Sequence, residues 1–296
     1  MIQCINRYLD GVKLLLEHGA DVNIKDGQGN SALILACRHY KDYNNKEESA
    51  EVIKLLATKG VNINEVSVFP SLIRGYERGT GLFEACIKNR LEIVTLLLEL
   101  GAATDDVEQN PLIESCALRN TDVARLLVAH GANMNVIDNG GRTSLSISCK
   151  EGYDDLVELL LDHGADMNLA SDTYSIKHPL LCATAHDWVS TVKLLLDRGA
   201  DVHRVGDVLP LNAACEHGQV GVARLLLERE ADVNGASRRG QTPLITAACS
   251  RTDHGMIDLL LEYGADINAE SRGCCALEVA DAVLFFFLNQ VLFNYN

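Results

Sequence analysis

The chain has 296 residues, of which 47% are hydrophobic and 23% are charged, and its formal net charge is −15. This balance is typical of a folded chain rather than a disordered one. The longest apolar runs are shorter than the roughly 20 residues that a membrane-spanning helix requires, and Met1–Asp10 lacks the basic start and apolar centre of a signal peptide. An acidic chain also lacks the basic surface that generic nucleic-acid binding needs, so we expect neither membrane insertion nor a nucleic-acid partner.

One phrase recurs eight times along the chain: an apolar triplet, a charged residue, a glycine and a short polar tail. The copies begin at Leu14, Leu55, Leu96, Leu126, Leu159, Leu194, Leu225 and Leu259. The steps between these starts are 41, 41, 30, 33, 35, 31 and 34 residues. Self-similarity at a period near 33 indicates a repeat architecture, so the chain is predicted to be an elongated stack.

The segment Gly240–Asn268 illustrates the elements of one unit. Thr242 can cap a helix with its hydroxyl, and Pro243 suits the first helical position, where its missing N–H costs nothing. A second helix carries the triplet Leu259–Leu261 and ends at Gly264. Each unit is therefore predicted as helix, turn, helix and extended connector. Such a unit is too small to bury its own apolar face, so the units must stack on one another.

These motifs resemble the ankyrin-repeat family, whose units of about 33 residues have a Thr-Pro-Leu helix start and a tail of the Gly-Ala-Asp-Val-Asn type. The resemblance covers roughly residues 2–288, although only Thr242-Pro243 has the full Thr-Pro pair. It implies an all-α solenoid of stacked helix-turn-helix units with extended connectors. It also implies a concave surface, formed by the inner helices and the connector tips, that binds a protein partner.

We expect a single ankyrin-repeat domain over residues 1–296. In chain order it comprises a partial first repeat at 1–30, repeats at about 31–79, 80–109, 110–142, 143–177, 178–208, 209–241 and 242–274, and a partial C-terminal repeat at 275–296.

The repeat at 31–79 departs from the pattern in two places. Between Cys37 and Val52 its helices are separated by about eight extra polar residues, which predict a solvated loop. The connector Glu65–Gly79 is also about eight residues longer than standard. It contains Phe69, Ile73, Arg74, Tyr76 and Arg78, the composition of an exposed interface loop. The alternative that these side chains fold back over the stack remains open. Later connectors add Tyr174, Arg238 and Arg239 as candidate partner-binding residues.

Six of the ten cysteines share one position in the repeat: Cys4, Cys37, Cys86, Cys116, Cys149 and Cys215. Equivalent points of stacked helices lie about 8–10 Å apart, beyond the roughly 7 Å Cα limit for a disulfide. These residues are interpreted as small, buried and unpaired, which favours a reducing compartment, the cytoplasm or the nucleus. Zinc binding is the alternative, but the chain has no Cys-x-x-Cys pair and no His-Glu-x-x-His, so we expect no metal and no cofactor.

Motifs for catalysis are weak. Gly27–Ala32 fits the Gly-x-Gly-x-x-Ala pattern of a dinucleotide-binding loop, but it falls in a connector that no predicted strand precedes. His18, His130 and His163 each stand just before the repeat glycine, where a solvated or helix-capping role is expected. Trp188, the only tryptophan, is expected to pack at the turn between two helices. Acids and bases at four repeated positions account for −11 of the net charge, so most of the charge reflects repetition rather than a special surface.

The two ends are unusual. Met1 falls within the first helix of a unit, and the run Ala282–Leu288 is apolar and aromatic where a terminal repeat is normally polar. This run either folds over the last repeat, docks on a partner or missing domain, or reflects a truncation. We expect a monomer, with the C-terminal run as the segment that could mediate association.

The function predicted from the sequence is that of a non-enzymatic scaffold or adaptor. The alternative is that the chain is the targeting or regulatory ankyrin module of a larger enzyme or channel. A third hypothesis follows from the family resemblance: Asn23 and Asn234 are similar to asparagines that an asparaginyl hydroxylase modifies.

Overall fold

The computed structural model describes residues 9–27, 29–38, 46–71, 75–105, 109–169, 178–203, 205, 208–237, 240–250, 254–271 and 274–275. The chain divides into two compact units, residues 1–140 and 141–296, and each is described by itself.

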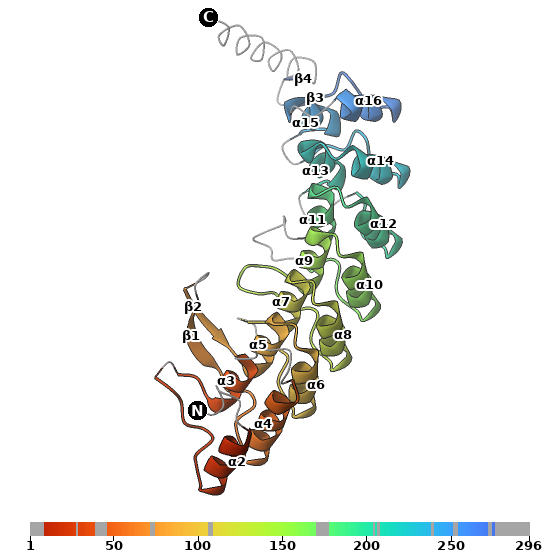
Figure 1. The fold of residues 1–296 in the computed structure, drawn as a ribbon. Coiled ribbons are helices and arrows are strands. Elements are labelled where there is room, and N and C mark those ends of the chain that lie inside the picture. The colour runs from red at the N-terminus through yellow and green to blue at the C-terminus, as the bar shows by residue number, and fades with distance from the viewer. Residues whose placement is uncertain are drawn as a thin grey trace, which may run out of the picture. The chain divides into compact units, whose positions relative to one another are not determined.

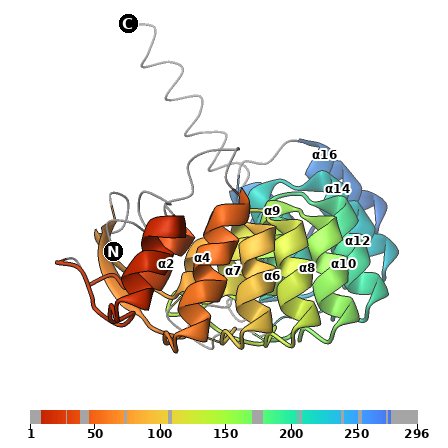
Figure 2. The ribbon, with the colours of Figure 1, turned by 60° about the horizontal axis from the view of Figure 1, so that its bottom comes forward.

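Unit 1 consists of helical pairs and one two-stranded sheet (Figure 1). Its elements are α2 (Leu9–Glu17), α3 (Ala32–Arg38), α4 (Lys46–Thr58), β1 (Ser67–Ser71), β2 (Gly75–Gly79), α5 (Gly81–Ile87), α6 (Leu91–Glu99), α7 (Pro111–Ala117) and α8 (Thr121–Ala129). The first helices α3, α5 and α7 pack in succession, and each also packs on its own second helix, α4, α6 or α8. Figure 2 shows α2, α4, α6 and α8 side by side in one row.

Unit 2 repeats the arrangement. Its helices are α9 (Ser144–Glu151), α10 (Asp154–Asp162), α11 (Pro179–Ala185), α12 (Val189–Asp197), α13 (Pro210–His217), α14 (Val220–Glu228), α15 (Pro243–Cys249) and α16 (His254–Glu262), followed by β3 (Glu270–Ser271) and β4 (Cys274–Cys275). The first helices α9, α11, α13 and α15 form one layer, and α10, α12, α14 and α16 form the second. The predicted ankyrin-type solenoid is thus confirmed, with two short antiparallel strand pairs added to it.

The first helices begin at capping residues. The side chain accepts a hydrogen bond from a first-turn N–H at Thr80 of α5, Asn110 of α7, Thr143 of α9, His178 of α11 and Thr242 of α15. Because the first turn of a helix has no intrahelical acceptors for its N–H groups, these caps fix where each helix starts. Leu209, the residue before α13, makes no such bond.

The core lies between the two helical layers. The middle leucine of the repeated triplet is fully buried at Leu97, Leu127, Leu160, Leu195, Leu226 and Leu260. Full burial of one such side chain stabilises the fold by about 1.5–3 kcal/mol. The cysteines of the first helices, Cys37, Cys86, Cys116, Cys149 and Cys215, are buried and form no disulfide, as predicted. Cys4 lies outside the described residues.

Two predictions for the repeat at 31–79 were wrong. The polar segment between Cys37 and Val52 is not entirely a loop, because α4 begins at Lys46 and includes the last six residues of that segment. The connector Glu65–Gly79, expected as an exposed loop, contains regular secondary structure. It forms a hairpin in which β1 and β2 pair antiparallel from Ser67↔Gly79 to Ser71↔Gly75. Val68, Phe69 and Tyr76 are residue types that favour strands, and the extra length of the connector allows two strands to form and pair.

Candidate protein-interaction surface

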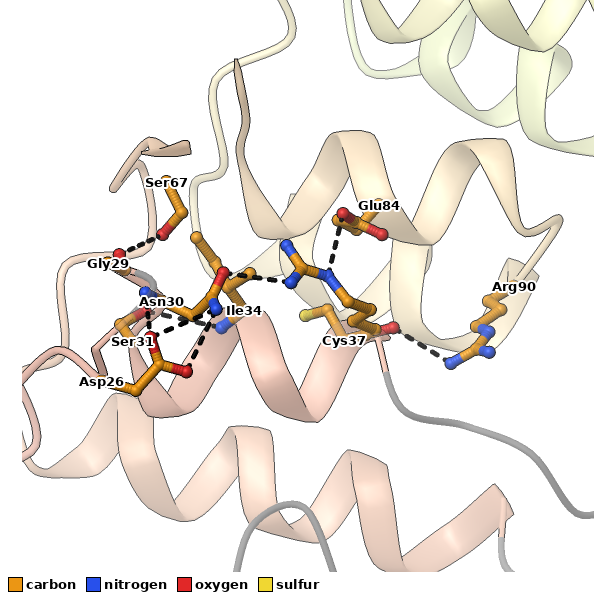
Figure 3. Close-up of polar contacts among 10 residues, drawn as sticks. Asp26, Gly29, Asn30, Ser31, Ile34, Cys37, Ser67, Glu84 and Arg90 are labelled. Atoms are coloured by element: carbon orange, nitrogen blue, oxygen red, sulfur yellow. Dashed lines mark hydrogen bonds and ion pairs between the residues drawn. The ribbon is translucent and has the colours of Figure 1, made fainter. Parts of the chain in front are cut away.

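The base of the β1–β2 hairpin is attached to the turn that precedes α3. The buried Ser67 hydroxyl donates a hydrogen bond of 2.9 Å to the Gly29 carbonyl oxygen (Figure 3). Just before the hairpin, the Lys25 ammonium and the Glu65 carboxylate form an ion pair of 2.8 Å. Strand β2 also contacts α5. The hairpin backbone is therefore attached at its base to two repeats.

A buried polar network continues from this turn (Figure 3). The Asn30 side chain donates to Asp26 Oδ2 at 3.1 Å, and its backbone N–H donates to Asp26 Oδ1 at 2.8 Å. Asn30 Oδ1 in turn accepts a 3.0 Å hydrogen bond from Arg38 Nη1. Asn30 thus uses its amide to connect a carboxylate with a guanidinium.

The network ends at a charge pair between two first helices. Arg38 Nε of α3 lies 3.2 Å from Glu84 Oε1 of α5, and the side chains are 17% and 3% exposed. A buried carboxylate is stable only when it is paired and hydrogen-bonded. The arrangement therefore joins α3 to α5 beside the hairpin, and its polar groups are used in structure rather than presented to a substrate.

The cysteine thiols of the core are poorly suited to chemistry. The pKa of Cys37 is raised to about 12, mainly by burial and also by the neighbouring Glu84 carboxylate, while Arg90 opposes the shift. Burial likewise raises the pKa values of Cys86 and Cys215 to about 12. Because the thiolate is the reactive and metal-binding form, these residues are inert at neutral pH. Among the described residues, no group of three or more His, Cys, Asp or Glu side chains could hold a metal ion.

The histidines before the repeat glycine cap helices. Nδ1 of His18, His130 and His163 lies 2.8–3.0 Å from the carbonyl oxygen four residues earlier, at Leu14, Leu126 and Leu159. The predicted capping role is confirmed. His178 has another role, because its Nδ1 accepts from the Leu180 N–H at 3.3 Å. Burial lowers the pKa of His178 to about 4, opposed by the Asp166 carboxylate.

The turn between the two helices of a repeat carries a hydrogen-bond ladder. In four repeats, the residue before the second helix donates a hydrogen bond from its side chain to a main-chain carbonyl at the end of the first helix of the preceding repeat. In unit 1 these bonds are Arg90 Nη1 to Cys37 O at 3.0 Å and Asn120 Nδ2 to Cys86 O at 2.9 Å. In unit 2 they are Trp188 Nε1 to Lys150 O at 2.8 Å and Gln219 Nε2 to Ala185 O at 3.1 Å. The predicted packing role of Trp188 is confirmed, whereas the ladder was not foreseen.

At the opposite end of the helices, the tails of neighbouring repeats are also bridged. Asn64 Oδ1 accepts from Ala103 N at 2.7 Å in unit 1. Asn234 Oδ1 accepts from Asp266 N at 2.8 Å in unit 2, and its Nδ2 donates to Gly264 O at 3.3 Å. The Asn234 amide is therefore part of the stack.

The structure places the candidate binding residues only in part. Phe69 lies in β1, where it pairs with Glu77, while Tyr76 and Arg78 lie in β2, opposite Pro70 and Val68. Their side chains are outside the described part of the structure, as are Ile73, Arg74, Tyr174, Arg238 and Arg239 altogether. The C-terminal run Ala282–Leu288 also lies outside it.

The geometry defines a class of protein: a stack of helical hairpins whose polar groups hold neighbouring repeats together. Within the described residues, no helix combines the length and apolar character needed to cross a membrane. Profiles of the family described as "Ankyrin repeats" match residues 1–44, 44–138, 82–171, 131–206 and 180–271. The chain belongs to the ankyrin-repeat family.

Similar proteins carry ankyrin repeats as well. The chain is 33% identical over 105 residues to the mouse "Ankyrin repeat and SOCS box protein 11" and 33% identical over 140 residues to the mouse "B-cell lymphoma 3 protein homolog". These matches cover 35% and 46% of this chain but only 30% and 29% of those proteins, so the chain spans about three tenths of their length.

Solved structures give the same result. The human ASB11 ankyrin repeat domain aligns with this chain with a TM-score of 0.60 and 27% sequence identity. The alignment covers 70% of this chain and 97% of that domain. The ankyrin repeat domain of Bcl-3, a member of the IkappaB protein family, aligns with a TM-score of 0.60 at 28% identity and covers 68% and 94%. Ankyrin repeats in this family form protein-interaction modules, and the same module is present here.

Proposed function

We propose that the chain is a non-enzymatic scaffold or adaptor that binds a protein partner on a concave, connector-bearing surface. The observation that carries this proposal is the attachment of the β1–β2 hairpin through Ser67 and Glu65. A hairpin that is fixed at its base loses little conformational entropy on binding, which favours affinity. Its sequence provides aromatic side chains and arginine, the residue types enriched at energetically important interface positions.

The proposed contact residues are those of the long connector and of two later connectors. They are Phe69, Ile73, Arg74, Tyr76 and Arg78, with Tyr174, Arg238 and Arg239 as further contacts. The division into repeats given above remains part of the proposal, as do the monomeric state, the association through Ala282–Leu288 and the reducing compartment. The buried cysteines that form no disulfide support the last of these.

An affinity capture from the source cells tests the proposal. The intact chain would be compared with a variant carrying Phe69→Ser and Tyr76→Ser, which keeps Ser67 and therefore the attachment of the hairpin. We expect one dominant protein on the intact chain and its loss from the variant. A matched control with Leu118→Ser changes an exposed apolar residue at the helix-turn end and should retain the partner. Capture of the same proteins by all three chains would contradict the proposal.

A second proposal is that the chain is the targeting or regulatory ankyrin module of a larger enzyme or channel. It is supported by the short span of the match, about three tenths of the two mammalian relatives. The native mass of the protein detected in the source cells distinguishes the two proposals. A mass matching 32.2 kDa would contradict the larger protein.

A further inference from the structure

The hydrogen-bond ladder does not by itself explain why position 188 is a tryptophan. The bond requires a side-chain N–H that reaches the preceding repeat, and Asn120 and Gln219 provide one with small amides. The indole ring of Trp188 exceeds this requirement. It is 40% exposed, and the next residue, Val189, is 38% exposed. The chain thus displays a large aromatic surface where an amide would suffice for stacking.

The ring is held in a fixed position on the preceding repeat. Gly152 has a φ of +70°, and a Cβ atom there would lie 2.5–2.9 Å from three atoms of the Trp188 ring. Only glycine allows the ring to lie this close to the backbone. The ring lies against Gly152 and its Nε1 donates to Lys150 O at 2.8 Å, so two contacts hold the indole on the preceding repeat.

The charged residues on the helix turns of three successive repeats of unit 2 are mainly acidic. The three helix turns of residues 150–154, 185–189 and 216–220 carry the carboxylates of Glu151, Asp154, Asp187 and Glu216 and one ammonium, Lys150. Lys150 forms an ion pair of 2.9 Å with Glu151, the residue before Gly152. Asp187 is the immediate neighbour of Trp188, is exposed, and is held at a φ of +57° while its Oδ1 accepts from the Val222 N–H. Because Asp187 directly precedes Trp188 in the chain, an exposed carboxylate lies one residue away from the exposed indole.

We propose that Trp188 and Asp187 form a docking site for an arginine side chain of a protein partner, at the end of the repeats opposite the connectors. A guanidinium stacks flat on an indole, and its N–H groups can at the same time bond a carboxylate, which an ammonium does less well. This site is separate from the hairpin and goes beyond the adaptor function proposed above.

The test uses the full chain, in which Trp188 is the only tryptophan, so that indole fluorescence reports on this site alone. The probes are acetyl-Gly-Ser-Arg-Ser-Gly-amide and the same peptide with citrulline in place of arginine, which keeps the shape and removes the charge. We expect the arginine peptide to half-saturate the change in emission at about a two- to fivefold lower concentration. Added NaCl should reduce this advantage. Equal half-saturation by both peptides, or no response to either, would overturn the proposal.

Three variants separate binding from folding. Trp188→Gln keeps the ladder donor, as Gln219 does, and should retain the unfolding midpoint while the arginine peptide no longer shifts the Gly152 amide signal in NMR. Trp188→Phe keeps a ring but loses the donor, so it should retain binding at a lower unfolding midpoint. Asp187→Asn keeps the backbone conformation, which Asn89 adopts at the equivalent turn with a φ of +52°, and should abolish the preference for arginine over citrulline.

The result does not depend on the hairpin. The variant Phe69→Ser with Tyr76→Ser should give the wild-type fluorescence titration even if it loses its partner in cells. Binding that is unchanged in both Trp188→Gln and Asp187→Asn would overturn the docking site and leave the proposed function of the hairpin standing.

Discussion

The two units join neighbouring first helices in different ways. In unit 1, α3 and α5 are joined by the buried pair of Arg38 and Glu84. In unit 2, α13 is joined to the segment of α15 by neutral groups, because Asn212 Nδ2 donates to Gln241 O at 2.9 Å and to the Thr246 hydroxyl at 3.3 Å. Loss of one partner leaves a charge behind in the first case and only a dipole in the second. The stability of the two repeats that contain α3 and α5 should therefore be more sensitive to a single substitution than that of the repeats that contain α13 and α15.

The largest effect is expected from Glu84→Ala. It leaves the Arg38 guanidinium without its carboxylate in a site where Arg38 is only 17% exposed. We expect a loss of about 3 kcal/mol in the free energy of unfolding of this region. Native-state hydrogen exchange of the α3 and α5 amides measures it, since stacked repeats can open in parts.

The matched change in unit 2 is Asn212→Ala, for which we expect a loss of about 1 kcal/mol, because Asn212 Oδ1 is already buried without a partner.

The double variant Arg38→Met with Glu84→Leu should recover most of the stability lost in Glu84→Ala, since apolar residues of similar size often replace a buried ion pair without cost. A double variant as unstable as the single one would show that the charges contribute more than we infer.

The second effect depends on pH and concerns the caps of α7 and α11. His178 caps α11 with Nδ1, which can accept only in the neutral form, and its pKa is lowered to about 4 from an ordinary 6.5. Because the folded pKa lies below the unfolded one, this stabilisation is complete above pH 6.5 and is lost as the pH falls toward 4. We expect unit 2 to lose about 2 kcal/mol between pH 7 and pH 5.

The first unit provides the control for this prediction. Asn110 caps α7 by accepting from Leu112 N and Ile113 N, both at 3.0 Å, and it does not titrate in this range. His178→Asn should therefore remove the loss between pH 7 and pH 5 and leave α11 in place. Hydrogen exchange of the α11 amides at pH 7 and pH 5 measures this. If the loss of stability at pH 5 persisted in His178→Asn, His178 would not be the titrating group.

The helix-turn ladder gives a smaller effect, and it should be similar in both units. Asn120→Ala in unit 1 and Gln219→Ala in unit 2 each leave a carbonyl without its side-chain donor. We expect about 1 kcal/mol for each, slightly more for the buried Asn120. Denaturant unfolding measures the loss of stability in both variants. The substitutions Asn120→Gln and Gln219→Asn, measured in the same way, test whether the hydrogen bond depends on the length of the side chain.

The parts of the fold that repeat were predictable from the sequence. The leucine triplets, the prolines at the first helical position and the cysteines at one register occur many times, so each local expectation was reinforced by its copies. The solvated or helix-capping role expected for His18, His130 and His163 had the same basis, and all three cap helices. A position in one repeat predicts the equivalent position in the next, because each repeat packs between two neighbours of similar structure.

The features that occur once were not predictable. The β1–β2 hairpin depends on the pairing of Val68 with Arg78 and of Phe69 with Glu77, which local composition does not specify. The ladder could not be predicted from residue type, because its members Arg90, Asn120, Trp188 and Gln219 share a side-chain N–H donor and nothing else. A comparison of the residue that follows the left-handed turn position in every repeat would have found it.

The smallest expected effect is a gain in stability, and it occurs in unit 2. Glu230 stands where the other described repeats have glycine before the tail, and it adopts a φ of +67°, compared with +93° for Gly199 and +83° for Gly264. A side chain with a Cβ atom is disfavoured in this left-handed region, whereas glycine is not. Glu230→Gly should therefore raise the free energy of unfolding by up to about 1 kcal/mol. Glycine also increases the entropy of the unfolded chain, which offsets part of the gain. The reverse change, Gly264→Glu, should destabilise by a similar amount, and thermal unfolding of the two variants gives both signs. If Glu230→Gly were destabilising, the Glu230 side chain would have to contribute more than its backbone strain costs.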